Sequence, residues 1–309
     1  MTWKPAKKLF ALATALMLVA TAAACGDDDD TATDETTTSE ATEPAFEAGT
    51  TMARIAEEGS ITVGIKFDQP GFGLTNPTTG EQDGFDVEIA KLIVAAIGED
   101  VDIDFVESIS ANREPFIEDG TVDMVVATYT INDTRKQRID FAGPYFVARQ
   151  DIMVMADDDS IASVEDLNGK NVCTVTGSTS ATNVAAAAPD ANITLLGTYS
   201  ECAEGMGDGR FEAVTTDNTI LAGLIQASEG AYKLVEAPFS DEPYGIGVKK
   251  DDDAFRDFIN DRLEEIFESG EWADAFAATL GAIGLDTPEP PEVDRYTETP
   301  PAPTTTAAP

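Results

Sequence analysis

Residues 122–128 read VDMVVAT, a run of apolar residues that only Asp123 interrupts. Such a short run predicts a strand that is buried on both faces, which is typical of parallel sheets. Upstream of it, residues 60–66 and 101–106 have the alternation of strands, whereas residues 85–97 and 114–119 have helical spacing. The order strand, helix, strand, helix, strand predicts an α/β fold with a parallel sheet.

The same alternation of periods starts again after residue 150. The sequence therefore predicts a second α/β lobe in series with the first. Two amphipathic helices follow this region, and their periodicity does not decide which lobe they cover. Strands are expected at residues 169–174, 192–196, 213–216 and 232–235, and helices at 181–188, 203–208, 220–227, 253–268 and 272–280.

The charge of the chain excludes several classes of function. The formal net charge is −39, and there is no histidine. A surface this acidic repels nucleic acid and gains nothing from anionic lipid headgroups. The lack of histidine excludes Ser-His-Asp and Cys-His catalysis and His-ligated metal sites, and we expect no metal and no cofactor. Because basic residues are scarce, any that converge on a cleft are informative.

The N-terminus has the pattern of a secretory signal. Lys4, Lys7 and Lys8 precede an apolar run at residues 9–19, which is shorter than the span of about 20 residues that crosses a membrane. Small residues lead directly into Cys25, which resembles a lipobox. The resemblance implies that residues 1–24 are a removed lipoprotein signal peptide. Cys25 would then carry the lipid, including palmitate, and anchor the protein to the outer face of the cell membrane. The alternative is an ordinary signal with an incidental cysteine.

Both ends of the chain have compositions that are typical of disorder. Residues 26–50 contain nine acidic residues and no basic ones, so residues 25–50 are expected to be a lipidated cysteine and a disordered acidic tether. Residues 286–309 are rich in Thr and Pro and are expected to be a disordered tail.

The other two cysteines, Cys173 and Cys202, lie in the predicted second lobe. We expect a disulfide between them because the N-terminus indicates an oxidising compartment. Two buried free thiols are the alternative. We expect neither cysteine to have a redox role.

Four separated motifs resemble one known family. Their order and spacing are similar to those of the polar amino-acid-binding proteins of ABC importers, solute-binding protein family 3, closest to the glutamate-binding branch of the actinobacteria. The resemblance implies a bilobal periplasmic-binding-protein-like fold, in which two α/β lobes are joined by two crossover strands and close around the ligand. The motifs are GFDVEIAKLI (84–93), SANREPFIEDGTVDMVVATYTINDTRKQRIDFAGPYF (110–146), GKNVCTVTGST (169–179) and AVTTDNTILAG (213–223).

The resemblance also implies the extent of each lobe. Lobe 1 would take residues 51–146 plus 241–285, and lobe 2 would take residues 151–237. The protein would be a monomer that delivers its ligand to an ABC permease and the ATPase of that permease.

The two charges that every free amino acid carries need partners in a closed cleft. By resemblance, Arg135 clamps the α-carboxylate together with Thr128 and Thr130, and Asp217 pairs with the α-ammonium. A turn of the second lobe would hold the same carboxylate with Thr176, Ser178 and Thr179.

Local sequence alone leaves other interpretations of these residues open. Arg135 could be a surface arginine that pairs with Asp133 or Asp140, and Asp133 or Thr134 could cap a short helix there. Asp217 could cap the helix at residues 220–227, and the turn at residues 176–179 could be a plain helix cap.

Two further cations bear on which amino acid is bound. By resemblance, Lys66 and Arg113 contact a distal carboxylate, which favours L-glutamate and possible L-aspartate binding, and Tyr199 offers a hydroxyl. Gln69 stands where binders of basic amino acids have an aromatic residue, which suits a short anionic ligand. Lys66 and Arg113 could instead be solvated surface residues.

Three other functions are compatible with parts of this sequence pattern. A glutamine or other neutral amino-acid binder would differ in the distal contacts. A sensor module that signals to a membrane kinase would have the same pocket. An enzyme on this scaffold would need an acid or base that is not paired with ligand charge, and no such residue stands out, so we expect no catalytic residue.

Overall fold

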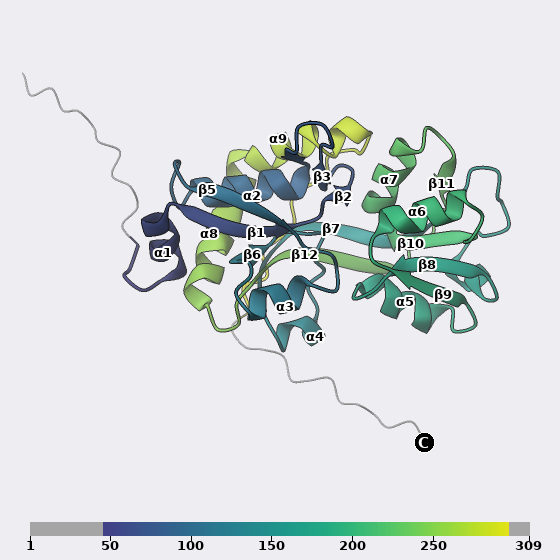
Figure 1. The fold of residues 1–309 in the computed structure, drawn as a ribbon, viewed down its shortest axis with the longest axis horizontal. Coiled ribbons are helices and arrows are strands. Elements are labelled where there is room, and N and C mark those ends of the chain that lie inside the picture. Colours follow the sequence, from purple (N-terminus) through teal and green to yellow (C-terminus); the bar gives the residue numbers. More distant parts are fainter. Residues whose placement is uncertain (1–45, 297–309) are drawn as a thin grey trace, which may run out of the picture. The chain divides into compact units, whose positions relative to one another are not determined.

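Two long strands, β7 (Asp140–Met155) and β12 (Ser240–Val248), run side by side and connect two α/β lobes (Figure 1). They pair antiparallel, from Ser240 opposite Gln150 to Val248 opposite Asp140. The structure is a computed structural model that describes residues 46–296. Within that part, nine strands form one sheet in the order β5-β1-β6-β12-β7-β10-β8-β9, and β11 pairs with β7.

The first lobe is built on three parallel strands. Strand β1 (Ser60–Ile65) pairs with β5 (Asp102–Glu107) on one side and with β6 (Met124–Val125) on the other. Strand β12 then pairs antiparallel with β6. The helices of this lobe are α1 (Thr51–Glu58), α2 (Phe85–Ala95), α3 (Arg113–Glu118), α4 (Asp133–Lys136), α8 (Asp253–Ser269), α9 (Glu271–Ala278) and the 3-10 turn η2 (Gly281–Ile283).

The second lobe repeats this plan. Strand β8 (Asn171–Val175) pairs parallel with β9 (Asn192–Leu196) and β10 (Ala213–Asp217), and β7 closes this half antiparallel to β10. The remaining elements are η1 (Val164–Leu167), α5 (Thr179–Ala187), α6 (Tyr199–Gly207), α7 (Asn218–Ala227) and β11 (Tyr232–Leu234).

The two C-terminal helices cover the first lobe. Gly270 adopts a left-handed conformation with φ 89° and separates α8 from α9. Trp272 of α9 is buried against Phe85 of α2, with ring centroids 5.6 Å apart. The Trp272 indole also donates a hydrogen bond to the carbonyl of Tyr145 on β7, 2.8 Å away. These contacts show that the two C-terminal helices cover the first lobe, which their periodicity alone does not decide.

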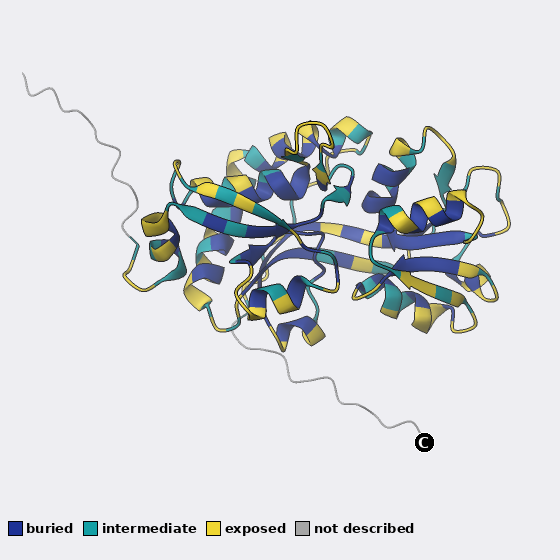
Figure 2. Cartoon of the chain, in the orientation of Figure 1, coloured by how far each residue is buried: buried dark blue, intermediate teal, exposed yellow. Residues whose placement is uncertain are grey.

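A small antiparallel sheet lies beside the first lobe. It contains β2 (Asp68–Gln69), β3 (Gly73–Thr75) and β4 (Gln82–Asp83) in that order. Its strands are two or three residues long, which is too short for a periodic pattern to predict. Figure 2 shows that burial is concentrated on the central strands of the large sheet and on the inner faces of the helices, whereas the outer strands β5 and β9 are intermediate or exposed.

Two expectations of disorder are wrong for the residues near the ends of the described part. Phe46, which was assigned to the tether, packs edge-on against Phe258, with ring centroids 5.6 Å apart. At the other end, Tyr296 accepts a hydrogen bond from the amide of Phe141 and donates one to Asp140, at 2.8 and 3.2 Å. Phe46 and Tyr296 each pack against the core of the described residues, which an average of the composition over a whole segment does not show.

Other predictions about the ends lie outside the described residues. These are the signal peptide at residues 1–24, the lipidation of Cys25, the tether up to residue 45 and the tail from residue 297. Among residues 46–296, no helix is both long enough and apolar enough to cross a membrane. We propose that the first lobe takes residues 51–146 plus 241–285 and that the second lobe takes residues 151–237.

Candidate functional site

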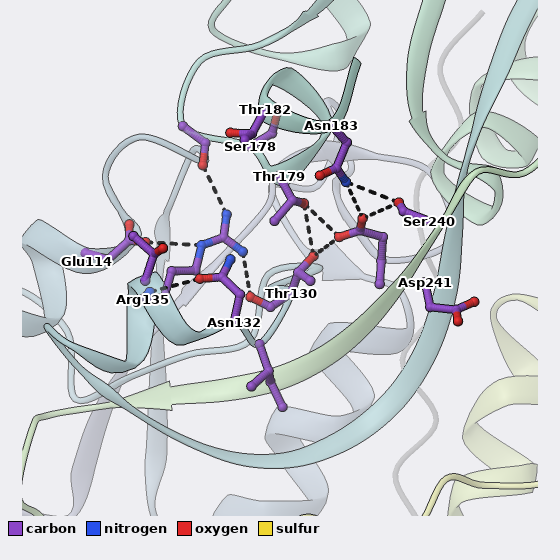
Figure 3. A pocket seen from close by; sticks show the side chains of 14 residues that line it. Glu114, Thr130, Asn132, Arg135, Ser178, Thr179, Thr182, Asn183, Ser240 and Asp241 are labelled. Atoms are coloured by element: carbon purple, nitrogen blue, oxygen red, sulfur yellow. Dashed lines mark hydrogen bonds and ion pairs between the residues drawn. The ribbon is translucent and has the colours of Figure 1, made fainter. Parts of the chain in front are cut away.

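A cavity of about 530 Å³ opens between the lobes beside the crossover strand β12 (Figure 3). The first lobe lines it with the start of α3 and the residues around α4, and the second lobe lines it with the start of α5. Four residues that were predicted for the site line this cavity: Thr130, Arg135, Ser178 and Thr179. The other lining residues are Glu114, Ile131, Asn132, Thr134, Gly177, Thr182, Asn183, Ser240, Asp241 and Glu242.

Arg135 lines this cavity and is buried, with 6% of its surface exposed. Its guanidinium donates hydrogen bonds to the carbonyls of Thr130 at 2.6 Å and of Gly177 at 3.1 Å, so it contacts both lobes. Its Nε lies 3.2 Å from a carboxylate oxygen of Glu114. The side chain is therefore held in place from three directions (Figure 3).

The surface interpretation of Arg135 is wrong. Its ion pair is with Glu114, whereas Asp140 pairs with Lys250 and lies near Arg256. The helix cap also differs from the expectation of Asp133 or Thr134. Asn132 precedes α4, and its side-chain oxygen accepts a hydrogen bond from the amide of Arg135 at 2.9 Å.

The ring of Tyr129 supports two guanidinium groups. The guanidinium carbon of Arg113 lies 4.1 Å from the ring centroid, and that of Arg135 lies 4.9 Å from it. The face of an aromatic ring attracts a cation, so the ring offsets part of the repulsion between the two arginines. Burial, and then the charge of Arg113, lower the pKa of Arg135 to about 10.

Lys66 joins the same group of cations through Ser110. The Lys66 ammonium donates to the hydroxyl of Ser110 at 3.0 Å, and Arg113 Nε donates to the carbonyl of Ser110 at 3.3 Å. Lys66 is 3% exposed and Arg113 is 2% exposed, so neither is a solvated surface residue. Burial and the nearby charge of Arg113 lower the pKa of Lys66 well below its ordinary value.

Arg113 also reaches the second lobe. It donates to the carbonyls of Ala127 and Thr128 at 3.1 Å each, and to that of Gly177 at 3.4 Å. Gly177 thus accepts from both Arg113 and Arg135. The hydrogen bonds link Lys66, Ser110, Arg113, Gly177 and Arg135 into one chain, which we call the cation chain. An anionic guest would supply the negative charge that this group attracts.

Asp217 is the buried anion at the C-terminal end of β10. One carboxylate oxygen, Oδ2, accepts a hydrogen bond from the hydroxyl of Tyr244 at 2.5 Å. The other, Oδ1, is buried and has no hydrogen-bond partner among residues 46–296. Asp217 stands before α7 but its side chain makes no capping hydrogen bond, so the helix-cap interpretation is wrong. Burial, and then the charge of Glu242, raise the pKa of Asp217 to about 7.

Thr128 is held in an unusual conformation by Asp86. Its φ is 43°, in the left-handed region that β-branched residues seldom adopt. The amide of Thr128 donates to Asp86 Oδ2 at 2.9 Å, and Tyr145 donates to Asp86 Oδ1 at 2.6 Å. The Thr128 hydroxyl donates to the side-chain oxygen of Gln69 at 3.0 Å. Burial raises the pKa of Asp86 to about 7.

The turn between β8 and α5 caps α5 with Ser178 and places Thr179 at the cavity. The Ser178 hydroxyl accepts from the amide of Ala181 at 3.0 Å, so it caps α5, and it donates to the carbonyl of Val175 at 2.7 Å. Thr179 faces the cavity. Thr176 is exposed, and its amide donates to the carbonyl of Leu196, so the structure does not bring this residue to the others.

Tyr199 lies deeper in the second lobe. It is buried, and its hydroxyl donates to Ser180 at 3.4 Å. Burial raises its pKa, and the charge of Asp217 adds to the effect.

Glu242 on β12 connects the two lobes. Its Oε2 accepts hydrogen bonds from the hydroxyls of Thr130 and Thr179 at 2.7 Å each. Its Oε1 accepts from Asn183 at 2.9 Å and from Ser240 at 2.6 Å (Figure 3). Two of the predicted ligand residues thus contact a carboxylate that comes from a crossover strand.

Several of these residues were missed in the sequence analysis. Asp86 had a signal, because it is an acidic residue within the apolar stretch FDVEI at the start of a helix. The others had none, because their partners are distant in sequence. The missed residues are Asp86, Ser110, Glu114, Glu242 and Tyr244.

A disulfide joins Cys173 of β8 to Cys202 of α6. It fixes the helix that carries Tyr199 to the strand that leads into the turn at Gly177. Among the described residues, no group of three or more His, Cys, Asp or Glu is placed to hold a metal ion.

The chain is similar to several curated proteins. It is 43% identical over 236 residues to the glutamate-binding protein GluB of Corynebacterium glutamicum, which covers 73% of this chain and 80% of the relative. It is 39% identical over 228 residues to the ABC transporter glutamine-binding protein GlnH of Bacillus subtilis, which covers 73% of this chain and 83% of the relative.

Solved structures have the same fold. An ancestral arginine-binding protein bound to glutamine matches with a TM-score of 0.68 and 36% identity, over 72% of this chain and 98% of that one. The family model of the bacterial extracellular solute-binding proteins, family 3, matches residues 61–281. These two findings confirm the predicted bilobal periplasmic-binding-protein-like fold. Together with the identity to the curated relatives, they show that the chain belongs to the bacterial extracellular solute-binding proteins of family 3.

Proposed function

We propose that this protein captures L-glutamate, and more weakly L-aspartate, between its lobes for an ABC importer. The cation chain is the observation that carries the proposal. Three buried cations, Lys66, Arg113 and Arg135, lie in one hydrogen-bonded chain, with the buried Asp217 as the anion for an ammonium group. Glutamate has two carboxylates and one ammonium, which complements this distribution of charge.

Each charge of the ligand is assigned to a group. Arg135 binds the α-carboxylate, since a guanidinium can pair with both of its oxygens. Asp217 binds the α-ammonium through the unpartnered Oδ1. Lys66 and Arg113 bind the distal carboxylate. Thr128, Thr130, Tyr199 and the turn at residues 177–179 are the remaining candidate contacts, and in the turn backbone groups rather than the capped Ser178 hydroxyl contribute.

The names of the relatives support an amino acid as ligand, and they are consistent with either an acidic or an amide side chain on that ligand. GluB is named for glutamate, whereas GlnH is named for glutamine. Calorimetry with L-glutamate, L-aspartate, L-glutamine and L-asparagine separates them. We expect glutamate to bind most tightly, and equal or tighter binding of glutamine would refute the roles of Lys66 and Arg113.

We further propose that Cys25 is lipidated and that the monomeric protein stays on the outer face of the membrane by this anchor alone. Labelling of growing cells with palmitate should mark the wild-type protein and not Cys25→Ala. A Cys25→Ala protein that remains in the membrane fraction would contradict the anchor. Loss of glutamate uptake on deletion of the gene would favour import, whereas normal uptake would favour the sensor alternative.

A further inference from the structure

The segment Asp68–Pro70 of the first lobe reaches across to two helices of the second lobe. The Ser200 hydroxyl of α6 lies 2.9 Å from the carbonyl of Asp68 and 3.0 Å from its Oδ2, and donates to these oxygens. The Ser200 amide lies 3.4 Å from the same Oδ2. Ser200 is the second residue of α6, so a carboxylate of the first lobe sits at the N-terminus of a helix of the second, where the helix dipole favours negative charge.

The second contact is between Pro70 and Gly223 of α7. A Cβ added at Gly223 would lie 2.3 Å from the carbonyl oxygen of Pro70 and 3.3 Å from its Cβ. Gly223 is buried in the middle of a regular helix and has no positive φ. Glycine at such a position destabilises the helix relative to alanine. The close approach of the first lobe therefore explains the glycine, and the conformation of α7 does not.

The residue between these two contacts faces the opposite way. Gln69 is 1% exposed and accepts a hydrogen bond from the hydroxyl of Thr128 at 3.0 Å. Lys66, two residues before Asp68, belongs to the cation chain. Lys66 just before the segment and Gln69 within it therefore contact the first-lobe residues of the candidate site, whereas Asp68 and Pro70 contact the second lobe.

The first lobe supports this segment firmly. The amides of Phe85 and Asp86, at the start of α2, donate to the carbonyls of Gly71 and Phe72 at 2.8 and 3.0 Å. Gly71 has φ 87°, and a Cβ added there would lie 2.8 Å from Ile283. The residues that directly follow the segment are thus fixed to the first lobe, which limits how far the segment can move relative to that lobe.

We propose that Asp68–Pro70 is a docking element that stabilises the closed form by binding α6 and α7, with Asp68, Ser200 and Gly223 as positioning residues. The proposal rests on the proposed function, in which the lobes close around the ligand. Helix α7 follows Asp217 directly and α6 begins with Tyr199. Contact with the element thus fixes the two second-lobe helices that carry candidate ligand residues.

The test uses the whole protein and two measurements. Small-angle scattering, with and without L-glutamate, measures the closed population, and stopped-flow measures the release rate of L-glutamate. Asp68→Ala and Ser200→Ala should each lower the closed population and speed release about 10-fold, as expected for loss of a hydrogen bond to a charged group. The double variant should be little worse than either single variant, because both remove one interaction.

Gly223→Ala gives an independent test. It should weaken binding at least about 10-fold while the ligand-free protein keeps or gains thermal stability, because alanine favours the helix. Gln226→Ala on the exposed face of α7 and Asp83→Ala on β4 are the matched controls and should change nothing. A residue that only stabilised its own lobe would lower the melting temperature instead.

The outcomes separate the two proposals. If wild type binds glutamine but not glutamate, the proposed ligand is wrong. The same variants measured with L-glutamine still show whether the docking element stabilises the closed form. If wild type binds neither amino acid, the role of the docking element is tested by comparing the closed population of the ligand-free variants with that of ligand-free wild type. An unchanged closed population in Asp68→Ala, Ser200→Ala and Gly223→Ala overturns the docking element whatever the ligand is.

Discussion

Tyr244 on the crossover strand β12 donates a hydrogen bond of 2.5 Å to Asp217 at the end of β10. The bond joins a strand that passes between the lobes to the buried anion of the second lobe. A hydrogen bond to the charged form of a carboxyl favours that form, so Tyr244 opposes the rise in the pKa of Asp217 that burial causes.

Removing this hydroxyl should therefore weaken binding of the ammonium group. We expect Tyr244→Phe to raise the Kd for L-glutamate about 10-fold, the usual effect of losing a hydrogen bond to a charged group. Calorimetry measures the change. Tyr232→Phe is the matched control, since its hydroxyl donates to the carbonyl of Ala203 within the second lobe. Equal effects of the two substitutions would contradict the role of Tyr244.

Arg135→Ala should abolish measurable binding of any amino acid. A buried carboxylate of the ligand would lose its partner, at a cost of about 3–5 kcal/mol. Arg138→Ala, three residues away and exposed with its ion pair to Glu118, is the control and should bind like wild type. Tight binding by the Arg135 variant would mean that the α-carboxylate lies elsewhere.

Lys66→Met should change which ligand is preferred. The substitution keeps the length of the side chain and removes its charge, so glutamate should lose about 10-fold or more in affinity while glutamine loses less. Competition between the two ligands measures the ratio directly. Lys91→Met on the exposed face of α2 should leave the ratio unchanged. A ratio that does not move in Lys66→Met would place the distal group of the ligand away from Lys66.

Binding should weaken as the pH falls below about 7. Asp217 has a pKa of about 7 without ligand, and a bound ammonium favours its ionised form. Below that pH, the ligand must displace a proton from Asp217, so the Kd should rise by up to about tenfold per pH unit. Calorimetry in two buffers of different ionisation enthalpy should detect the released proton. No proton release at pH 6 would contradict the state of Asp217.

The stability of the ligand-free protein should show the opposite trend. A carboxyl whose pKa is raised on folding binds its proton more tightly in the folded state. Its contribution is therefore fully present below pH 4 and is lost as the pH rises through about 7. Asp217→Asn should flatten this part of the curve of unfolding free energy against pH, and Asp86 should account for part of the remaining slope. An unchanged curve would refute the prediction.

Much of the fold could be predicted because its strands and helices have clear periods. The parallel strands β1, β5 and β6 and the helix α2 were predicted within a few residues. The exact extent of β7 was not, since its apolar run is broken by Gly143, Pro144 and Arg149 and it serves both lobes. The pairing of β7 with β12, from Asp140 opposite Val248 to Gln150 opposite Ser240, sets their length, and no local pattern contains that information.

The candidate site could be predicted only in part, because motifs indicate single residues and not the groups that orient them. Motifs pointed to Lys66, Arg113, Arg135 and Asp217, and the structure buries all four. The groups that orient them come from elsewhere in the chain: Tyr244 is 27 residues from Asp217, and Glu242 is 112 residues from Thr130. A single sequence shows which residues are charged but not which distant residues neutralise them.

The shared strand β7 also limits how this molecule can be divided. Its first residues pair with β12 beside the first lobe, and its last ones pair with β10 and β11 in the second. A fragment that ends before residue 150 would deprive β10 and β11 of their antiparallel partner β7, and one that begins there would deprive β12 of most of its pairing with β7. Chimaeras that exchange ligand pockets between relatives should therefore transfer both crossovers with the donor half, or neither half will fold on its own.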